Sequence, residues 1–303
     1  MTSFSLTILG SSSALPTSQR FPTAQIVTLS EQFYLIDCGE GTQMQLRKFR
    51  FRIGKINHIF ISHLHGDHYF GIFGLISTMQ LLDRKGDLHI YGPKGLKDAI
   101  GYQLDHFDKL SFPIIFHEIE TNGICRLYES SRLIVESIPL KHRIPTCGFL
   151  FREKPRQLNI QKEAIEKYSL SIREIVQVKN GENVVRENGD TILYNDCTLP
   201  PEKPRTYAYC SDTLYKEDII PQIKNIDLLY HEATYMHNMA SRAKETFHST
   251  ALQAATIAKM AEVKKLVIGH FSARYKSSKE LVEEARTVFP ETYAAEDGLS
   301  FDV

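Results

Sequence analysis

Residues 61–71, ISHLHGDHYFG, place three histidines and one aspartate within six positions, directly after an apolar run. These four side chains are His63, His65, Asp67 and His68. Neutral imidazoles and carboxylates are the usual ligands of zinc and similar ions, and four such donors exceed what one ion takes from one loop. The cluster predicts two neighbouring metal ions, each completed by ligands from elsewhere. The alternative is a polar surface loop, which the preceding apolar strand disfavours.

The missing ligands are expected in the same context, just past the end of a strand. Three candidates have it: His142 follows RLIVESIPLK, Asp212 follows TYAYCS and His270 follows KLVIG. Asp212 offers two oxygens and could bridge two cations. A single histidine after a strand is more often structural, but a matched set beside H-x-H-x-D-H favours a metal site. We also expect Gly66 to let the backbone turn, so that the donors on both sides of it converge.

The composition is that of an ordinary globular protein, with 303 residues of which 42% are hydrophobic and 24% charged. This length allows one large core or two small ones. The first ten residues lack the basic segment of a secretory signal. The longest apolar stretch, residues 69–82, is interrupted by glycine, serine and threonine and is too short to span a bilayer. The five cysteines form no C-x-x-C pair, which favours reduced thiols in the cytoplasm.

Charge alone gives no sign of a nucleic acid partner. Lys+Arg and Asp+Glu both number 36. Basic clusters occur at residues 47–55, 152–156 and 202–205, and taken singly each is interpreted as a solvated surface.

Short β-rich runs recur along the whole chain, and helical patterns lie between some of them. Helices are predicted over residues 71–84, over 92–106 with Pro93 in the first turn, over 248–263 with Ser249 or Thr250 as N-cap, and over 277–289. Strands and helices mixed over the whole length predict layered α/β structure in a single domain, residues 1–303.

One region differs in character from the rest. Residues 155–200 are polar and charged, with a helical pattern over 161–168 and a hairpin that turns at Asn188 and Gly189. This region is predicted to be an arm inserted into the core and not a separate domain.

Several stretches spread over nearly the whole chain resemble the ribonuclease Z family of metallo-β-lactamase-fold hydrolases. H-x-H-x-D-H alone marks only the superfamily, whereas the glycine-rich DCGEGTQ, the HEAT stretch and the H-S-T stretch together are far more specific. The stretches that carry the resemblance beside the H-x-H-x-D-H loop are LGSSSALPT, IDCGEGTQMQL, PLKHRIPTCGF, PEKPRTYAYCSDT, LLYHEATY, HSTALQAA and IGHFSARY.

The resemblance implies a four-layer αββα sandwich with a protruding arm. It also implies two zinc ions, one held by His63, His65 and His142 and the other by Asp67, His68 and His270, with Asp212 and a water between them. The implied activity is removal of the 3′ trailer from precursor tRNA in the cytoplasm, by attack of a hydroxide shared between two metals. The family's short form is a homodimer, and the same is expected here.

The resemblance further assigns roles around the metal ions. Asp67 is implied as a proton acceptor. His248, which lies just before a predicted helix N-terminus, is expected beside the departing oxygen, with Glu232 orienting it. The alternative is that His248 only packs there. Asp37 ends a strand and is expected to fix the metal loop from outside the ligand set.

Residues 201–206, PEKPRT, resemble the family's loop near the RNA 3′ end, where Lys203 and Arg205 could meet phosphates. The arm departs from the family pattern, because residues 156–199 contain no proline and only two glycines. Two other functions stay open. One is a hydrolase of small phosphodiesters, sulfate esters or lactones on the same fold, and the other is an RNA-binding protein without catalysis.

Overall fold

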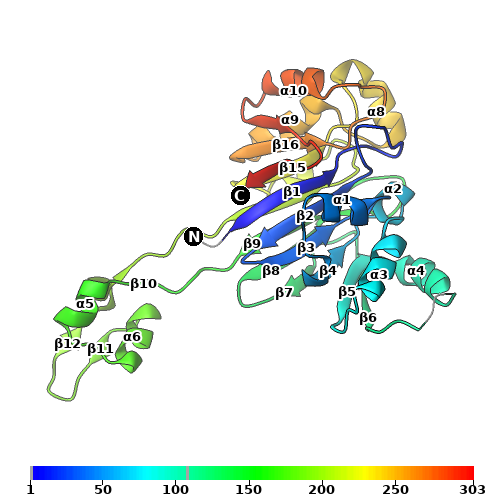
Figure 1. Ribbon diagram of the computed structural model, residues 1–303. Helices are drawn as coiled ribbons and strands as arrows, with labels where there is room; N and C mark the ends of the chain where they lie inside the picture. The colour runs from blue at the N-terminus through cyan, green and yellow to red at the C-terminus, as the bar shows by residue number, and fades with distance from the viewer. Residues whose placement is uncertain (1–2, 107–108) are drawn as a thin grey trace. The chain divides into compact units, whose positions relative to one another are not determined.

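The computed structural model describes residues 3–106 and 109–303 (Figure 1). Contacts divide the chain into two compact units. The larger, the core unit, comprises the residues up to 128 with 135–151 and 205–303. The smaller, the arm unit, comprises 129–134 and 152–204 and so contains the predicted excursion 155–200. That the whole chain forms one domain stays a prediction.

The first large sheet has the strand order β18-β1-β2-β3-β4-β5-β6. Strands β1, β2 and β3 pair antiparallel, whereas β3, β4, β5 and β6 run parallel, so their carboxyl ends share one edge. The strands are β1 (Phe4–Gly10), β2 (Ala24–Leu29), β3 (Gln32–Ile36), β4 (Ile56–Phe60), β5 (Leu88–Pro93), β6 (Ile114–Ile119) and β18 (Ser300–Asp302). The associated helices are α1 (Thr42–Lys48), the 3₁₀ turn η1 (Ile53–Lys55), α2 (Gly66–Tyr69), α3 (Ile72–Leu81) and α4 (Leu96–Leu104).

The second large sheet has the order β17-β16-β15-β14-β9-β8-β7. Strands β14 to β17 run parallel and again place their carboxyl ends at one edge. The strands are β7 (Arg126–Glu129), β8 (Leu133–Pro139), β9 (Cys147–Glu153), β14 (Thr206–Cys210), β15 (Leu228–Glu232), β16 (Lys265–Gly269) and β17 (Thr292–Ala294). The associated helices are α8 (Ala240–Thr246), α9 (Ala251–Met260) and α10 (Lys279–Arg286), with the 3₁₀ turns η2 (Glu217–Ile219) and η3 (His237–Met239).

The core unit has the predicted αββα layers, with the two sheets facing each other between helices (Figure 1). Aromatic side chains fill the space between the sheets: the ring centroids of Phe60 and Phe149 are 5.5 Å apart. The hydroxyl of Tyr207 donates a 2.5 Å hydrogen bond across this layer to Gln25. Each sheet therefore buries both faces, which explains the nearly continuous apolar runs of its central strands.

The arm unit has a small hydrophobic core of its own, formed by Ala164, Leu170, Val178, Val184, Ile192 and Cys197. A capping box at Ser171 and Glu174 starts its longest helix. The predicted hairpin is confirmed, with Gly189 at φ +91° in its turn. The elements are β10 (Asn159–Ile160), α5 (Lys162–Lys167), α6 (Ile172–Lys179), β11 (Val184–Val185), β12 (Thr191–Ile192), α7 (Tyr194–Cys197) and β13 (Thr198–Leu199).

Two local predictions can be compared with the structure directly. Thr250 is the N-cap of α9, as one of the two predicted candidates, and forms a capping box with Gln253. The position of Pro93 was predicted wrongly, because it ends β5 and the helix begins only at Leu96, after Gly95 in a left-handed conformation. In the described part of the chain, no helix combines the length and the hydrophobicity that crossing a membrane requires.

Candidate metal centre and active site

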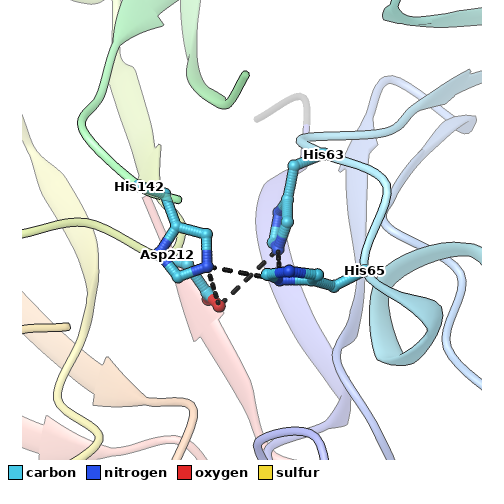
Figure 2. Close-up of side chains that lie close together, drawn as sticks. All are labelled: His63, His65, His142 and Asp212. Atoms are coloured by element: carbon cyan, nitrogen blue, oxygen red, sulfur yellow. Dashed lines mark hydrogen bonds and ion pairs between the residues drawn. The ribbon is translucent and has the colours of Figure 1, made fainter. Parts of the chain in front are cut away.

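The first group of potential metal ligands consists of His63, His65, His142 and Asp212, whose donor atoms all lie within 4.8 Å of one another. Nδ1 of His65 lies 3.1 Å from Nε2 of His63 and 3.2 Å from Nε2 of His142. Oδ2 of Asp212 lies 3.6 Å from His63 Nε2 and 3.7 Å from His142 Nε2. The four side chains converge from two sides, and each side belongs to a different sheet (Figure 2).

The second group consists of Asp67, His68 and His270. Oδ2 of Asp67 lies 3.4 Å from His68 Nε2 and 3.5 Å from His270 Nε2. The other oxygen of Asp212, Oδ1, lies 3.5 Å from His68 Nε2 and 3.2 Å from His270 Nε2. Asp212 thus faces each group with one of its two oxygens, which is the arrangement of a bridging carboxylate.

The residues fit a metal ion at each group. Ligand atoms about 2.0–2.1 Å from a tetrahedral ion are separated from one another by about 3.3–3.5 Å. The donor pairs whose distances are given above lie 3.1 to 3.7 Å apart. Nε2 of His68, Nε2 of His270 and Oδ1 of Asp212 are buried without a hydrogen-bond partner among the described residues. Buried polar atoms rarely lack partners, and these three point where a cation would accept their lone pairs.

In His142 and His68, the ring nitrogen that faces away from the metal groups donates a hydrogen bond, which fixes the tautomer. Nδ1 of His142 lies 2.8 Å from the carbonyl oxygen of Phe247 and must donate to it. Nδ1 of His68 donates in the same way to Oδ2 of Asp37 at 2.7 Å. Each bond leaves the Nε2 lone pair directed at the metal group, as ligand histidines require.

Asp37 has the contacts expected of a residue that fixes the metal loop. Its Oδ1 accepts a 2.8 Å hydrogen bond from the backbone N–H of Ser62, directly before His63. Its Oδ2 accepts a 2.6 Å hydrogen bond from the hydroxyl of Tyr209, on the other sheet, in addition to the bond from His68. Asp37 therefore connects the H-x-H-x-D-H loop with both sheets.

Two residues of the site, Asp37 and His270, have a left-handed backbone conformation. Asp37 has φ +53° directly after β3, and His270 has φ +60° directly after β16. Such a conformation costs a residue other than glycine about 1 kcal/mol or more and persists mostly at functional sites. Gly66 was expected to let the backbone turn, and this reason for a glycine at position 66 is wrong. Gly66 begins the one-turn helix α2 that carries Asp67 and His68, and a Cβ there would lie 2.4 Å from the ring of Phe70.

Burial controls the charge of the His63 imidazole. Burial, helped by the neighbouring imidazole of His68, lowers the pKa of His63 well below its ordinary value. The ring of His63 is therefore neutral near pH 7, which is the form that binds a metal ion.

His248 and Glu232 lie beside the two groups. Nδ1 of His248 lies 3.0 Å from Oε1 of the fully buried Glu232, so that nitrogen donates to the carboxylate. Burial lowers the pKa of His248, but the charges of Glu232 and Asp212 outweigh burial and raise it to about 9. The His248 side chain is 14% exposed, so the ring is a cation at neutral pH that retains access to solvent.

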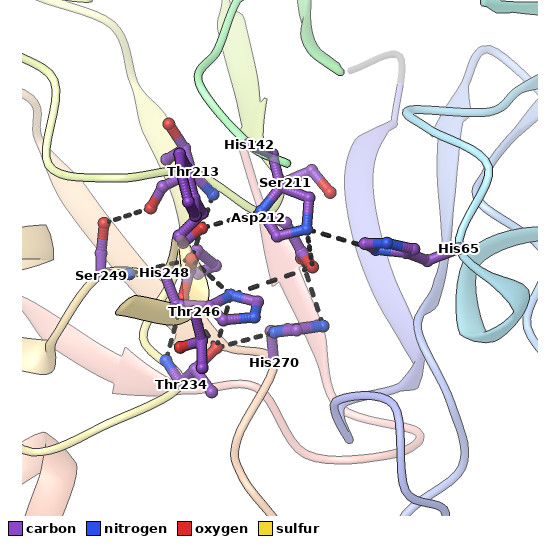
Figure 3. Close-up of polar contacts among 12 residues, drawn as sticks. His65, His142, Ser211, Asp212, Thr213, Thr234, Thr246, His248, Ser249 and His270 are labelled. Carbon is purple, nitrogen blue, oxygen red and sulfur yellow. Dashed lines mark hydrogen bonds and ion pairs between the residues drawn. The ribbon is translucent and has the colours of Figure 1, made fainter. Parts of the chain in front are cut away.

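Glu232 contacts more than His248. Its Oε1 also accepts hydrogen bonds from the backbone N–H groups of Thr213 and Ser249, at 3.1 and 2.9 Å. Its Oε2 accepts a 2.8 Å bond from the hydroxyl of Thr234, whose oxygen lies 2.8 Å from Nδ1 of His270 (Figure 3). Because the Thr234 proton goes to Glu232, the oxygen accepts from His270. One carboxylate thus orients both His248 and a candidate metal ligand.

His248 itself could be considered a metal ligand, because its donor atom lies within 4.8 Å of those of Asp212 and His270. Nδ1 of His248 lies 3.9 Å from Asp212 Oδ2. That nitrogen already donates to Glu232, so its lone pair is not available. The geometry favours His248 as a proton donor and not as a ligand.

The metal groups open into a cavity of about 530 Å³, lined among others by Asp67, His142, Asp212 and His248. Arg143 and Arg242 also line it and were not singled out by the sequence. Arg143 follows His142 within PLKHRIPTCGF, whereas Arg242 lies in none of the stretches that resemble the family. Arg205 does not line it in the described part of the chain, and Lys203 belongs to the arm unit. Arg205 precedes β14 and stacks over the ring of Phe4, whereas Asp212 follows the other end of that strand.

Curated relatives match this chain along its full length. Ribonuclease Z of Bacteroides thetaiotaomicron is 50% identical over 304 residues, covering all of this chain and 96% of that protein. Ribonuclease Z of Porphyromonas gingivalis is 45% identical, with both chains covered completely. The family model "Anti-Pycsar protein Apyc1" matches residues 4–106.

Two solved structures also match this chain over nearly its full length. The crystal structure of human tRNase Z, short form, superposes with a TM-score of 0.71 at 28% identity and covers 98% of each chain. YhfI from Bacillus subtilis, a metallo-β-lactamase fold protein, also gives a TM-score of 0.71, with both chains fully covered. Its identity is 19%, so this second likeness shows the fold alone.

Proposed function

The chain belongs to the ribonuclease Z family, and on that premise we propose that it is a zinc-dependent endoribonuclease that removes the 3′ trailer from precursor tRNA. The product tRNA would end in a 3′ hydroxyl and the trailer would begin with a 5′ phosphate. The observation that carries the proposal is the pairing of His248 with Glu232 beside two metal-ligand groups, each of which faces one oxygen of Asp212.

Two zinc ions would be held by His63, His65 and His142 and by Asp67, His68 and His270, with Asp212 facing both. When bound, a pair of such ions lowers the pKa of a water and balances charge on phosphoryl oxygens. Asp67, whose Oδ2 lies in the second group, is proposed to accept a proton from the attacking water as well.

His248 is proposed to act on the departing oxygen. Its Nδ1 is engaged with Glu232, so its Nε2 is the nitrogen that can donate to the substrate. The hydrogen bond to the Glu232 carboxylate favours the protonated ring of His248. A proton donor suits the departing 3′ oxygen of a ribose, which is a poor leaving group as an alkoxide.

The binding of the RNA body is proposed to involve the arm and the PEKPRT loop. Lys203 is exposed and Arg205 is half-buried, and both are cations that could contact phosphates. Within the cavity, Arg143 and Arg242 add positive charge near the cleavage site. The arm carries a compact fold of its own, which could contact the RNA body as a preformed unit.

We also propose a cytoplasmic homodimer. The family resemblance supports the dimer, and light scattering during size-exclusion chromatography tests it. The five cysteines are free thiols, which agrees with a reducing compartment.

The experiment that tests the function is cleavage of a labelled precursor tRNA by the zinc-loaded protein, compared with small phosphodiesters, sulfate esters and lactones. We expect one cut at the start of the trailer. A protein that hydrolyses the small substrates but leaves the precursor intact would instead be a small-molecule hydrolase on the same fold. Binding without cleavage in the presence of zinc would indicate an RNA-binding protein.

A further inference from the structure

A second cavity lies on the other side of His248. It has a volume of about 420 Å³ and is separate from the cavity that holds the metal groups. Of the residues that line the two cavities, His248 is common to both. Its imidazole therefore stands between the metal ligands and this second space.

The lining of the second cavity combines apolar, aromatic and polar groups. Leu214 and Ala240, both half-buried, supply apolar wall, and the ring of Tyr215 adds an aromatic surface. The hydroxyl of Tyr215 points away to Glu217, to which it donates a 2.8 Å hydrogen bond. The side chain of Lys244 supplies a cation at the exposed rim. An apolar and aromatic pocket with a few polar groups and a nearby cation is suited to a nucleobase with its phosphate.

Gln253 supplies the polar contact. Its Oε1 accepts a 3.0 Å hydrogen bond from the backbone N–H of Thr250, as part of the capping box of α9. Its Nε2 has no hydrogen-bond partner in the part of the chain that the structure describes, and the side chain lines the cavity. The cap fixes the amide with its oxygen toward the backbone, so the cavity is presented with an N–H donor. Every nucleobase carries an acceptor that such a donor can contact.

We propose that this cavity is a subsite for the base of the last nucleotide that stays on the tRNA. The inference rests on the proposed function, in which His248 lies beside the departing 3′ oxygen. That oxygen belongs to the ribose of the last retained nucleotide. Since the phosphorus lies toward the metal ligands, the nucleotide attached to the departing oxygen lies beyond His248, where the second cavity is found.

The test is a comparison of precursor tRNAs that carry either a normal base or an abasic ribose at the last retained position. The measured quantity is the base advantage, defined as the ratio of kcat/KM for the normal and the abasic precursor. For the wild-type protein we expect a base advantage of about tenfold or more, the scale of one stacked and hydrogen-bonded base.

Two variants of different chemistry should reduce the base advantage toward one. Gln253→Glu keeps the capping box, because a glutamate oxygen also accepts from Thr250, but it removes the N–H donor. Ala240→Phe fills the cavity from α8. The matched controls are Gln103→Glu and Ala99→Phe on α4, which line neither cavity and should keep the wild-type base advantage.

The ratio is measured within each variant, so a general loss of stability or activity cancels. A wild-type base advantage in both cavity variants would overturn the proposal. The same ratio can be measured with the abasic ribose placed at the first trailer nucleotide. If the cavity variants reduced that ratio instead, the proposal would also be overturned, because the cavity would then hold the trailer. If the wild-type protein failed to cut precursor tRNA at all, the proposed function itself would fail, a result distinct from the other two.

Discussion

Glu232 holds His248 through a 3.0 Å contact between Oε1 and Nδ1, and no candidate metal ligand intervenes between them. His248→Ala should therefore keep the bound metal and the fold while kcat on precursor tRNA falls by ~10²–10⁴, the range for loss of a proton donor. Single-turnover cleavage and metal analysis of the same preparation check this.

The matched control is His237→Ala, which removes an exposed histidine on η3. It should stay within a few-fold of wild type. If His248→Ala is equally active, the His248–Glu232 pair is structural only.

Metal content gives a second prediction. We expect two zinc equivalents per chain in the wild-type protein. The Asp212→Ala variant should bind zinc more weakly at both sites, because each oxygen of the Asp212 carboxylate faces one of the two groups. Titration of the apoprotein with zinc, followed calorimetrically, measures both affinities. Asp98→Ala, an exposed aspartate on α4, should bind like wild type. Full activity with a single ion would contradict the dinuclear arrangement.

The arm unit leads to a third prediction. Replacing residues 157–196 with a short Gly/Ser linker removes the arm's own core but none of the candidate ligands. KM for whole precursor tRNA should rise, because remote contacts with the RNA body are lost, while hydrolysis of a small phosphodiester stays nearly unchanged. Steady-state kinetics on both substrates decide the matter, and equal losses would mean that the arm supports the core.

The cleavage products follow from the position of His248. The departing oxygen beside it should be the 3′ oxygen, so end-group analysis should find a 3′ hydroxyl on the tRNA and a 5′ phosphate on the trailer. Water is the nucleophile, and a 2′-deoxy nucleotide at the cleavage position should still be cut. A 2′,3′-cyclic phosphate, or complete loss of cutting at the deoxy position, would overturn the mechanism.

A histidine cluster between the sheets should make stability pH-dependent. Burial, with the neighbouring His89 and His117, lowers the pKa of His58 from 6.5 to about 4. The unfolded chain therefore takes up a proton first as the pH falls, and His58 destabilises the fold progressively between pH 6.5 and 4.

The free energy of unfolding should fall from pH 7 to pH 5 in the wild-type protein. In His58→Phe this fall should be smaller by about 1 kcal/mol, after allowance for partial solvent exposure. Urea unfolding of the metal-loaded protein at the two pH values measures this. His106→Gln replaces an exposed histidine and should behave as wild type. An unchanged pH dependence in His58→Phe would mean that other groups dominate.

The convergence of the candidate ligands could be predicted from sequence because it obeys a local rule. His63 and its neighbours form a compact motif, and Asp212 and His270 each follow an apolar run that had to be a buried strand. Since parallel strands end at a common edge, their side chains meet there. The layer order followed from the family resemblance, and α3, α9 and α10 followed from apolar periodicity.

Contacts between distant segments could not be predicted in the same way. The carbonyl of Phe247 and the hydroxyl of Thr234 orient His142 and His270, but a backbone oxygen or a common hydroxyl gives no sequence signal. Tyr209 appeared only as one residue of a strand, although its hydroxyl reaches Asp37 on the other sheet. The second cavity beside His248 arises from the packing of α8 and α9 against the loop after β14, which no single stretch encodes.

The candidate ligands are divided between the two sheets: one set follows β4, and the other follows β8, β14 and β16. Neither sheet alone can complete a coordination shell, so each bound ion would act as a non-covalent cross-link between the halves of the sandwich. Ligands that bind only the native state stabilise it in proportion to the logarithm of their free concentration. Metal supply would then affect how long the protein stays folded as well as its activity. When the ion is scarce, the two sheets would separate more readily and the chain between them would become accessible to proteases.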